Sequence, residues 1–284
     1  MGIKVTLHLD DREEVEVKVL KFSGGEVQPR LQNPQLYRPL YATITANINS
    51  SDMLMTVLMT TDALRRAYPD VKIRLRCPYF PYARQDRVCH PGEALAVEVV
   101  SKLIDVQDYH QLEIWDIHNE DSFQFLKRTN IYHRHADEFV SRIDLTNTVI
   151  VAPDKGAVKR AQRCADLTGV PPLKAEKVRD PDTGDITGTT IDLQNYIDQG
   201  GQAGLRGTEN FLMVDDIADG GRTFIQLAEV LRPLTTGKIN LYVTHGIFSA
   251  DFHVFKGKID HIYTPNLFEP HCRADRKPDF VTIL

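Results

Sequence analysis

The stretch Phe211-Leu-Met-Val-Asp-Asp-Ile-Ala-Asp-Gly-Gly-Arg-Thr-Phe224 decides how the second half of this sequence folds. Its apolar beginning is typical of a buried strand, and two adjacent carboxylates, Asp215 and Asp216, stand at the carboxyl end of that strand. The residues that follow are a third carboxylate, a glycine turn and the start of an amphipathic helix: Asp219, Gly220, Gly221, Arg222 and Thr223.

This order of strand, acidic pair, glycine turn and helix predicts a site for a phosphorylated sugar. The N–H groups of the turn and of the helix N-terminus can bind phosphate, and carboxylates can accept hydrogen bonds from ribose hydroxyls. Ligands of α/β proteins bind at the carboxyl ends of strands, where the acidic pair stands. The alternative is an ordinary turn in which Asp and Gly serve only as turn formers.

The composition is that of a globular protein with one large or two medium domains, because 42% of its 284 residues are hydrophobic and 26% are charged. A net charge of -5 argues against a nucleic-acid partner. The N-terminus lacks the apolar segment of a signal peptide, and the most apolar stretch, Met53–Met59, is too short to span a membrane. The four cysteines have no CxxC spacing, so we expect free thiols and a cytoplasmic protein.

Two stretches of the first half carry candidate chemistry. The predicted strand Lys72–Cys77 leads into a loop in which two prolines and three aromatic residues hold Arg84 and Gln85, whose planar groups suit a base and its phosphates. A solvated run of charges is the alternative.

His118 follows the predicted strand Leu112–Ile117, and Asp116 would share its strand face. The alternative for His118 is a structural histidine. A helix is expected over Pro91–Leu103.

The second half repeats the plan of the first. A buried strand over Thr148–Ala152 ends near Asp154, and a helix is expected over Ala157–Leu167. Lys174–Arg179 and Ile186–Leu193 would form a flap with an exposed turn between them, in which Lys177 and Arg179 point the same way.

This alternation of strands and helices predicts an α/β fold of two doubly wound, mostly parallel-sheet domains. We place their boundary so that residues 1–134 form an N-terminal domain and residues 135–284 a C-terminal domain, whose tail packs back on one of the two.

Four stretches together resemble the ribose-phosphate diphosphokinases, also called phosphoribosyl pyrophosphate synthetases. In chain order they are Tyr79-Phe-Pro-Tyr-Ala-Arg-Gln-Asp-Arg87, Asp116-Ile-His118, Ala152-Pro-Asp-Lys-Gly-Ala-Val-Lys-Arg-Ala161 and Val214-Asp-Asp-Ile-Ala-Asp-Gly-Gly-Arg-Thr223. Each piece alone is only suggestive, but the four stand in the family's order and spacing over nearly the whole chain. The resemblance implies two domains of phosphoribosyltransferase type, the first carrying an ATP loop and the second a catalytic flap and a ribose-phosphate loop.

The resemblance also implies the reaction, its cofactor and its site residues. The β,γ-diphosphate of ATP would pass to the anomeric 1-hydroxyl of a ribose, AMP would leave, and Mg²⁺ would assist. The family's dimer-based assembly implies a homo-oligomer in which a neighbouring subunit completes the ATP site. The implied residues are Phe22, Glu26, Arg84 and Gln85 for ATP; His118 and Asp154 for the metal; Lys177 and Arg179 for catalysis; and Asp215, Asp216, Asp219, Gly220, Gly221, Arg222 and Thr223 for the ribose substrate.

These residue types suit the reaction on chemical grounds. Phosphoryl chemistry of this kind needs positioning and charge neutralisation more than covalent catalysis. Magnesium takes few protein ligands and keeps waters and phosphate oxygens, so one His and one Asp suffice. Lys177 and Arg179 on a closing flap would supply positive charge when substrates are bound and would exclude water.

The ribose-phosphate loop departs from the family's usual Asp-Thr-Gly-Gly-Thr. A hydroxyl is lost at Gly220, and Arg222 adds a guanidinium that can clamp phosphate. Both changes would suit a larger acceptor than ribose 5-phosphate, namely ADP-ribose, which would give ADP-ribose 1-diphosphate for NAD synthesis. The family's usual substrate remains slightly favoured. Gly24 also departs, at a position near the adenine.

Two other classes of protein compete with this interpretation. A phosphoribosyltransferase would share the Asp215–Thr223 loop, but it would not need a second α/β domain with the Arg84–Gln85 loop. A non-catalytic partner subunit of the family is the second alternative. Such subunits tend to lose flap or metal residues, whereas this chain retains Lys177, Arg179, His118 and Asp154.

Overall fold

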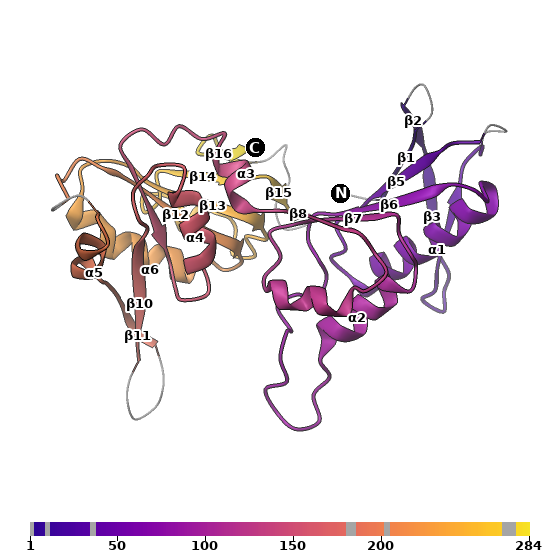
Figure 1. Cartoon of the computed structure of the whole chain (residues 1–284), viewed down its shortest axis with the longest axis horizontal. Helices are drawn as coiled ribbons and strands as arrows, with labels where there is room; N and C mark the ends of the chain where they lie inside the picture. The colour runs from indigo at the N-terminus through magenta and orange to yellow at the C-terminus, as the bar shows by residue number, and fades with distance from the viewer. Residues whose placement is uncertain (1–2, 9–11, 35–37, 180–185, 202–204, 269–276) are drawn as a thin grey trace. The chain divides into compact units, whose positions relative to one another are not determined.

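The computed structural model describes the chain except for residues 1–2, 9–11, 35–37, 180–185, 202–204 and 269–276, and the side chains of residues 7, 8, 12, 13, 177–179, 186 and 187 are not described either (Figure 1). The chain divides into two compact units, unit 1 from Met1 to Arg134 and unit 2 from His135 to Leu284.

Unit 1 is built on a six-stranded sheet with the order β2-β1-β5-β6-β7-β8. Its strands are β1 (Lys4–His8), β2 (Arg12–Val15), β5 (Tyr41–Thr45), β6 (Lys72–Cys77), β7 (Gln111–Trp115) and β8 (Ile131–Arg134). The strands from β5 to β8 run parallel, and β1 is antiparallel to both of its neighbours. The parallel part therefore presents several carboxyl ends at one edge.

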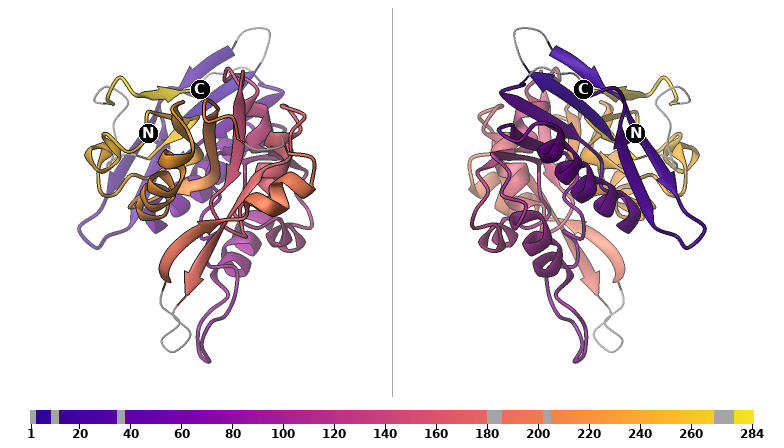
Figure 2. Two further views of the ribbon diagram at one scale, coloured as in Figure 1. Left: turned by 90° about the vertical axis from the view of Figure 1, so that its left-hand side faces the viewer. Right: turned by 90° about the vertical axis from the view of Figure 1, so that its right-hand side faces the viewer.

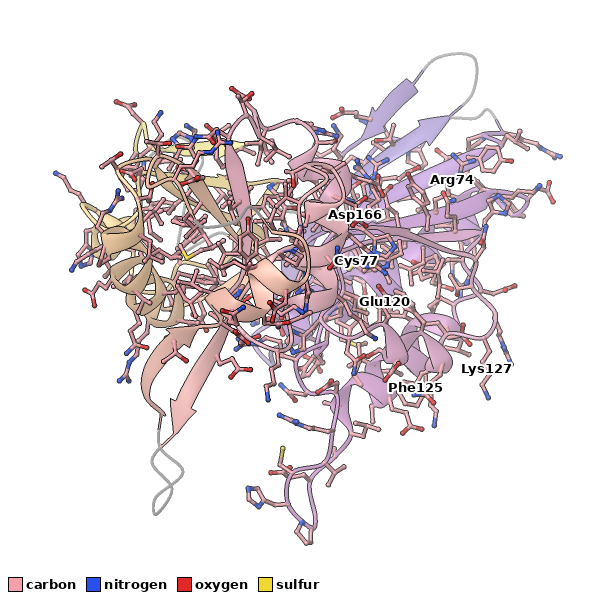
Figure 3. The ribbon with its side chains drawn as sticks, turned by 60° about the vertical axis from the view of Figure 1, so that its left-hand side comes forward. Arg74, Cys77, Glu120, Phe125, Lys127 and Asp166 are labelled. Atoms are coloured by element: carbon pink, nitrogen blue, oxygen red, sulfur yellow. The ribbon has the colours of Figure 1, made fainter. Side chains whose placement is uncertain are left out.

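Helices cover the apolar face of this sheet. They are α1 (Ser51–Ala67), α2 (Ala96–Asp105) and the 3₁₀ helix η1 (Glu120–Phe125), and Figure 1 shows α1 and α2 on the same side of the strands. Strand β6 presents the fully buried Cys77 to the core and Arg74 to the opposite face (both are labelled in Figure 3). The guanidinium of Arg74 lies 4.1 Å from the centre of the Tyr41 ring.

One helix of unit 1 begins later than expected. Helix α2 begins at Ala96 and not at Pro91, because the Glu93 carboxylate accepts the backbone N–H groups of Cys89 (2.8 Å) and His90 (3.0 Å) and holds this segment in a turn. A separate two-stranded hairpin is formed by β3 (Val17–Lys21) and β4 (Val27–Leu31).

Unit 2 contains an eight-stranded sheet with the order β11-β10-β9-β12-β13-β14-β16, and β15 also pairs with β13. Its strands are β9 (Thr148–Ala152), β10 (Leu173–Arg179), β11 (Ile186–Ile191), β12 (Asn210–Ala218), β13 (Ile239–Gly246), β14 (His261–Thr264), β15 (Asn266–Leu267) and β16 (Val281–Ile283). Every pair is parallel except β10 with β11. The prediction of an α/β fold with mostly parallel sheets is confirmed.

The helices of unit 2 are α3 (Ala136–Val140), α4 (Val158–Ala165), α5 (Leu193–Asp198), α6 (Arg222–Leu231) and the 3₁₀ helices η2 (Arg232–Leu234) and η3 (Phe252–Phe255). Buried residues of β12, β13 and α6, among them Phe211, Leu227 and Leu241, form the core. Figure 2 shows the β10–β11 hairpin projecting beyond the other strands of this unit. No helix in the described part of the chain is long and apolar enough to cross a membrane.

Candidate functional site

The acidic pair lies at the carboxyl edge of the sheet of unit 2. Met213 on β12 pairs in register with Val151 on β9, so Asp215 lies two residues beyond the level of Val151, as does Pro153. Strand β12 does not end at the pair as expected but continues to Ala218, because Asp215, Ile217 and Ala218 go on pairing with β13. The carboxylates therefore stand on a rigid strand and not on a turn.

A buried arginine contacts both carboxylates. Arg160 on α4 has a side chain that is only 9% exposed, and its Nη1 lies 3.3 Å from Asp215 Oδ1 and 3.7 Å from Asp216 Oδ1. Burial raises the pKa of the Asp215 carboxyl well above its ordinary value, the charge of Asp216 raises it further, and Arg160 lowers it in part. The pair is thus a compact, negatively charged group of acceptors with one fixed cation.

The glycine turn after β12 leads directly into α6. Gly221 has a φ of 78°, in the left-handed region that favours glycine, and it is the N-cap of the helix. As a glycine it offers no side-chain acceptor to the N–H groups of the first helical turn, which leaves them suited to an anion. Arg222 is exposed at this helix start, and a Cβ placed on Gly220 would meet no atom within 4 Å.

A second loop, residues 247–251, packs against the turn. The N–H groups of Ile247 and Phe248 donate to the Ala218 carbonyl at 2.9 and 3.0 Å, and Ser249 Oγ donates to Asp219 Oδ1 at 2.5 Å. These bonds hold Asp219 at the level of the turn. Asp219 is therefore fixed between β12 and the glycine turn.

Replacing Gly221 by alanine is expected to destabilise unit 2. A Cβ at this position would lie 2.4 Å from Phe255 Cζ, and the φ of 78° disfavours any L side chain. Left-handed strain of about 1–2 kcal/mol and overpacking of about 1–3 kcal/mol together predict a clearly lower thermal midpoint. The matched control is Gly220→Ala, for which we expect little change in the midpoint. Equal midpoints for the two variants would contradict this account.

Asp154 lies just beyond the end of β9 at the same edge. Its Oδ1 accepts the backbone N–H groups of Gly156 (2.9 Å) and Ala157 (3.3 Å), which fixes the carboxylate over the start of α4. Carboxylate oxygens are donors that Mg²⁺ prefers. Asp154 therefore has the chemistry of the metal ligand that the sequence predicts.

The predicted flap is the β10–β11 hairpin. Strand β10 pairs with β9 at Leu173 and Lys174 and then with β11 from Ala175 on, and its register shifts between Val178 and Arg179. The backbones of Lys177 and Arg179 lie in β10, whereas their side chains and the expected turn over 180–185 lie outside the described residues. Their common direction stays a prediction.

In unit 1, the predicted ATP loop and the His118 segment are joined by side chains. Phe80 and Ala83 are each 2% exposed and anchor the loop, so that Arg84 and Gln85 remain exposed. Asn119 Nδ2 donates to Asp86 Oδ2 at 2.9 Å, which links the residue after His118 to the residue after Gln85. The structure therefore brings these two candidates together.

The idea that Asp116 shares a strand face with His118 is wrong. Strand β7 ends at Trp115, and Asp116 adopts a positive φ of 42°. Its backbone N–H donates to the Arg134 carbonyl at 2.7 Å, and the residue is 3% exposed, whereas His118 is exposed. The alternation of a strand does not apply beyond Trp115.

Phe22 and Glu26 lie in the turn of the β3–β4 hairpin. The N–H of Phe22 donates to the Glu26 carbonyl at 2.9 Å, and the Phe22 side chain is 55% exposed. Lys21 Nζ bonds Asp52 Oδ2 at 2.5 Å in the first turn of α1, where Ser51 also bonds the Tyr82 hydroxyl at 3.0 Å. The hairpin and the ATP loop thus meet the same helix start.

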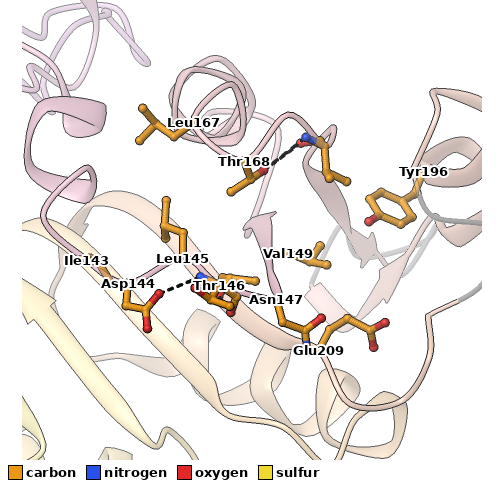
Figure 4. Close-up of a pocket in the computed structure, with 12 residues that line it drawn as sticks. Ile143, Asp144, Leu145, Thr146, Asn147, Val149, Leu167, Thr168, Tyr196 and Glu209 are labelled. Atoms are coloured by element: carbon orange, nitrogen blue, oxygen red, sulfur yellow. Dashed lines mark hydrogen bonds between the residues drawn. The ribbon is translucent and has the colours of Figure 1, made fainter.

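A pocket of about 440 Å³ in unit 2 lies away from these residues (Figure 4). It is lined by Thr148 and Val149 of β9 and by Glu209, which precedes β12, so it lies at the amino ends of the strands. Burial alone would raise the pKa of Glu209, but backbone N–H donors of residues 206–208 outweigh it and lower the pKa. This carboxylate serves the turn before β12 and is not part of the candidate site.

Two residues of the site were not found from the sequence, Arg160 and Ser249. Arg160 lies on the same helix face as the buried Ala157, Ala161 and Cys164. An arginine among small, apolar residues on a buried helix face indicates that its charge is buried too. For Ser249 the sequence carries no comparable signal, because its bond to Asp219 spans thirty residues.

The fold and the site define a two-domain protein of phosphoribosyltransferase type. Residues 4–107 match the family model for the N-terminal domain of ribose phosphate pyrophosphokinase, and residues 121–251 match that for the phosphoribosyl transferase domain. The chain is similar to a phosphoribosylpyrophosphate synthetase structure from Mycobacterium smegmatis, with a TM-score of 0.73, 20% identity, and coverage of 95% of this chain and 86% of that one. At 20% identity, the likeness to this structure shows the fold alone.

The sequence relatives identify the family. The chain is 31% identical over 240 residues to a ribose-phosphate pyrophosphokinase from Thermococcus kodakarensis, covering 83% of this chain and 79% of the relative. It is 34% identical over 246 residues to the one from Pyrococcus furiosus, covering 82% and 78%. The chain therefore belongs to the ribose-phosphate pyrophosphokinase family and is an enzyme of the diphosphotransferase class.

Proposed function

We propose that this enzyme transfers the β,γ-diphosphate of ATP to the anomeric hydroxyl of a ribose phosphate, and that ribose 5-phosphate is the acceptor. The observation that carries the proposal is the set of carboxylates at one edge of the unit 2 sheet, where Asp154 follows β9 and where Asp215 and Asp216 lie on β12. The glycine turn and the uncapped start of α6 lie directly beyond them. The names of the relatives support this acceptor.

The acceptor would be held by its hydroxyls and its phosphate. Asp215 and Asp216 accept hydrogen bonds from the ribose hydroxyls, which orients the 1-hydroxyl for in-line attack on the β-phosphorus of ATP. Asp219 and residues 220–223 surround the 5-phosphate with N–H donors. These contacts would hold the 1-hydroxyl in the orientation that in-line attack requires.

Unit 1 would bind ATP. Phe22 and Glu26 border the adenine, and the exposed Arg84 and Gln85 contact the nucleotide and its phosphates. In unit 2 the carboxylate of Asp154 would hold Mg²⁺, which supplies neutralisation of the phosphate charge when it is bound. In unit 1 the exposed ring of His118 has the chemistry of a metal ligand. Lys177 and Arg179 would add positive charge at the phosphates as the flap closes.

ADP-ribose is a second candidate acceptor, and the glycine turn favours it. No atom lies within 4 Å of a Cβ at Gly220, and Arg222 is exposed at the helix start, so the turn has space and a guanidinium for a second phosphate. With this acceptor the product would be ADP-ribose 1-diphosphate, a precursor for NAD synthesis.

A single assay tests the reaction and separates the acceptors. The enzyme is supplied with ATP and Mg²⁺, and with ribose 5-phosphate or ADP-ribose in separate reactions, and AMP release is measured. We expect AMP with ribose 5-phosphate. AMP with ADP-ribose alone would reassign the acceptor, and no AMP with either would instead favour a non-catalytic subunit of the family.

We also propose that the enzyme acts as a homo-oligomer. The β3–β4 hairpin supports this, because Val19, Leu20 and Phe22 expose 42%, 43% and 55% of their surface on one short segment. An exposed apolar group of this kind is typical of a surface that another chain covers.

A further inference from the structure

Arg160 is buried beside two carboxylates, and its place is set by α4. Its side chain is 9% exposed and contacts Asp215 Oδ1 at 3.3 Å and Asp216 Oδ1 at 3.7 Å, and these two side chains are 17% and 7% exposed. Neighbouring carboxylates with so little contact with water repel one another strongly. A single guanidinium that contacts both is the group that offsets this repulsion.

The same helix holds the predicted metal ligand. Helix α4 begins at Val158, directly after the turn in which Asp154 Oδ1 accepts the N–H groups of Gly156 and Ala157. The N–H of Ala161 donates to the Ala157 carbonyl at 2.8 Å, so the turn continues into the helix without a break. Arg160 therefore ties the element that carries Asp154 to the strand that carries Asp215 and Asp216.

We propose that Arg160 is a positioning residue of this enzyme: it keeps Asp215 and Asp216 side by side as acceptors for the ribose hydroxyls and fixes their place relative to Asp154. This inference rests on the proposed function, because it assumes that the two carboxylates bind the acceptor. Arg160 acts through the carboxylates and not on the substrate itself. Its loss should therefore weaken use of the ribose acceptor far more than use of ATP.

The variants Arg160→Gln and Arg160→Lys test this inference, with Lys159→Gln as the control. Lys159 is the preceding residue on α4, and its side chain is exposed, so the control removes a neighbouring charge without touching the pair. Lysine keeps the charge of Arg160 but has a point-like ammonium in place of the planar guanidinium, so it restores the contact in part.

The KM values for both substrates are measured with ribose 5-phosphate, or with ADP-ribose if that is the acceptor the wild type uses. For Arg160→Gln we expect the acceptor KM to rise about 100-fold, the change that corresponds to losing a charged hydrogen bond. For Arg160→Lys we expect a rise of about 10-fold, since part of the interaction is kept. The ATP KM should stay within about 2-fold for both, because few contacts to the nucleotide depend on the pair.

The outcomes separate the inference from the proposed function. A wild type that releases no AMP with either acceptor refutes the function and with it the inference. An active wild type whose Arg160 variants match Lys159→Gln, or lose acceptor and ATP affinity equally, overturns the inference alone. If Arg160→Gln does not fold, the ratio of the two KM values for Arg160→Lys decides: a selective rise for the acceptor supports the inference, and equal changes refute it.

Discussion

Lys177→Ala should reduce turnover by at least about 10³-fold, as the loss of a cation that stabilises a phosphoryl-transfer transition state does, and leave ATP binding nearly intact. The backbone of Lys177 lies in β10, three residues beyond the point where this strand pairs with Ala152 at the end of β9. Its ammonium would neutralise the charge that develops on the transferred diphosphate. AMP release measures turnover, and calorimetric titration measures ATP affinity.

Lys174→Ala is the matched control for this prediction. Lys174 lies on the same strand, and its Nζ bonds Gln199 Oε1 at 3.4 Å at the base of the hairpin. We expect turnover close to that of the wild type. Unchanged turnover of Lys177→Ala, or an equal loss in both variants, would refute the assignment of Lys177.

Asp215→Asn should lower turnover by about 100-fold, because it replaces one carboxylate oxygen by an NH2 group that cannot accept a hydrogen bond from a ribose hydroxyl. The same change should make the folded protein more stable at neutral pH. Burial, and then the neighbouring charge of Asp216, raises the pKa of Asp215 in the folded state. The pKa of an aspartate in the unfolded chain is about 4. Above this pH the folded state keeps a proton on Asp215 that the unfolded chain releases, so the free energy of unfolding falls as the pH rises toward the folded-state pKa. Asparagine removes that dependence.

The test compares the thermal midpoints of wild type and Asp215→Asn at pH 5 and pH 7.5. We expect the thermal midpoint of the variant to lie above that of the wild type, and the difference to be larger at pH 7.5. Each kcal/mol of added stability raises the midpoint by about 2–4 °C in a chain of this size. Asp166→Asn, which alters an exposed carboxylate on α4's end, is the control and should show no such gain. A lower midpoint for Asp215→Asn at pH 7.5 would contradict the account.

Local patterns predicted the secondary structure around the candidate site well where they act along one segment. The apolar run, the acidic pair and the glycines between Phe211 and Phe224 predicted a strand, a turn and a helix, and the structure contains β12, Gly221 as N-cap and α6. The register of parallel strands then brings Asp154 and Asp215 to one edge. These features follow from alternation and from the chemistry of turns, which a sequence displays directly.

What could not be predicted depends on contacts between segments far apart in the chain. Arg160 meets Asp215 across fifty-five residues, and Ser249 meets Asp219 across thirty. The extension of β12 past the carboxylates depends on pairing with β13. His118 differs from the prediction because the strand ends earlier, at Trp115, than its apolar pattern indicates. Tertiary partners decide each case, and local preference gives way to them.

The attachment of the β10–β11 hairpin has a mechanical consequence. Within the described residues, β10 is paired to the rest of the sheet through Leu173 and Lys174, and beyond them it pairs with β11. Arg179 is five residues further on, at the end of an arm of about 17 Å at roughly 3.3 Å per residue. A pivot of about 10° at the base would carry the backbone of Arg179 through about 3 Å, the length of one hydrogen bond. The pairing that attaches the hairpin to β9 is short and lies beside Asp154. A small rotation of the hairpin about this base would be enough to make or break a contact at Arg179.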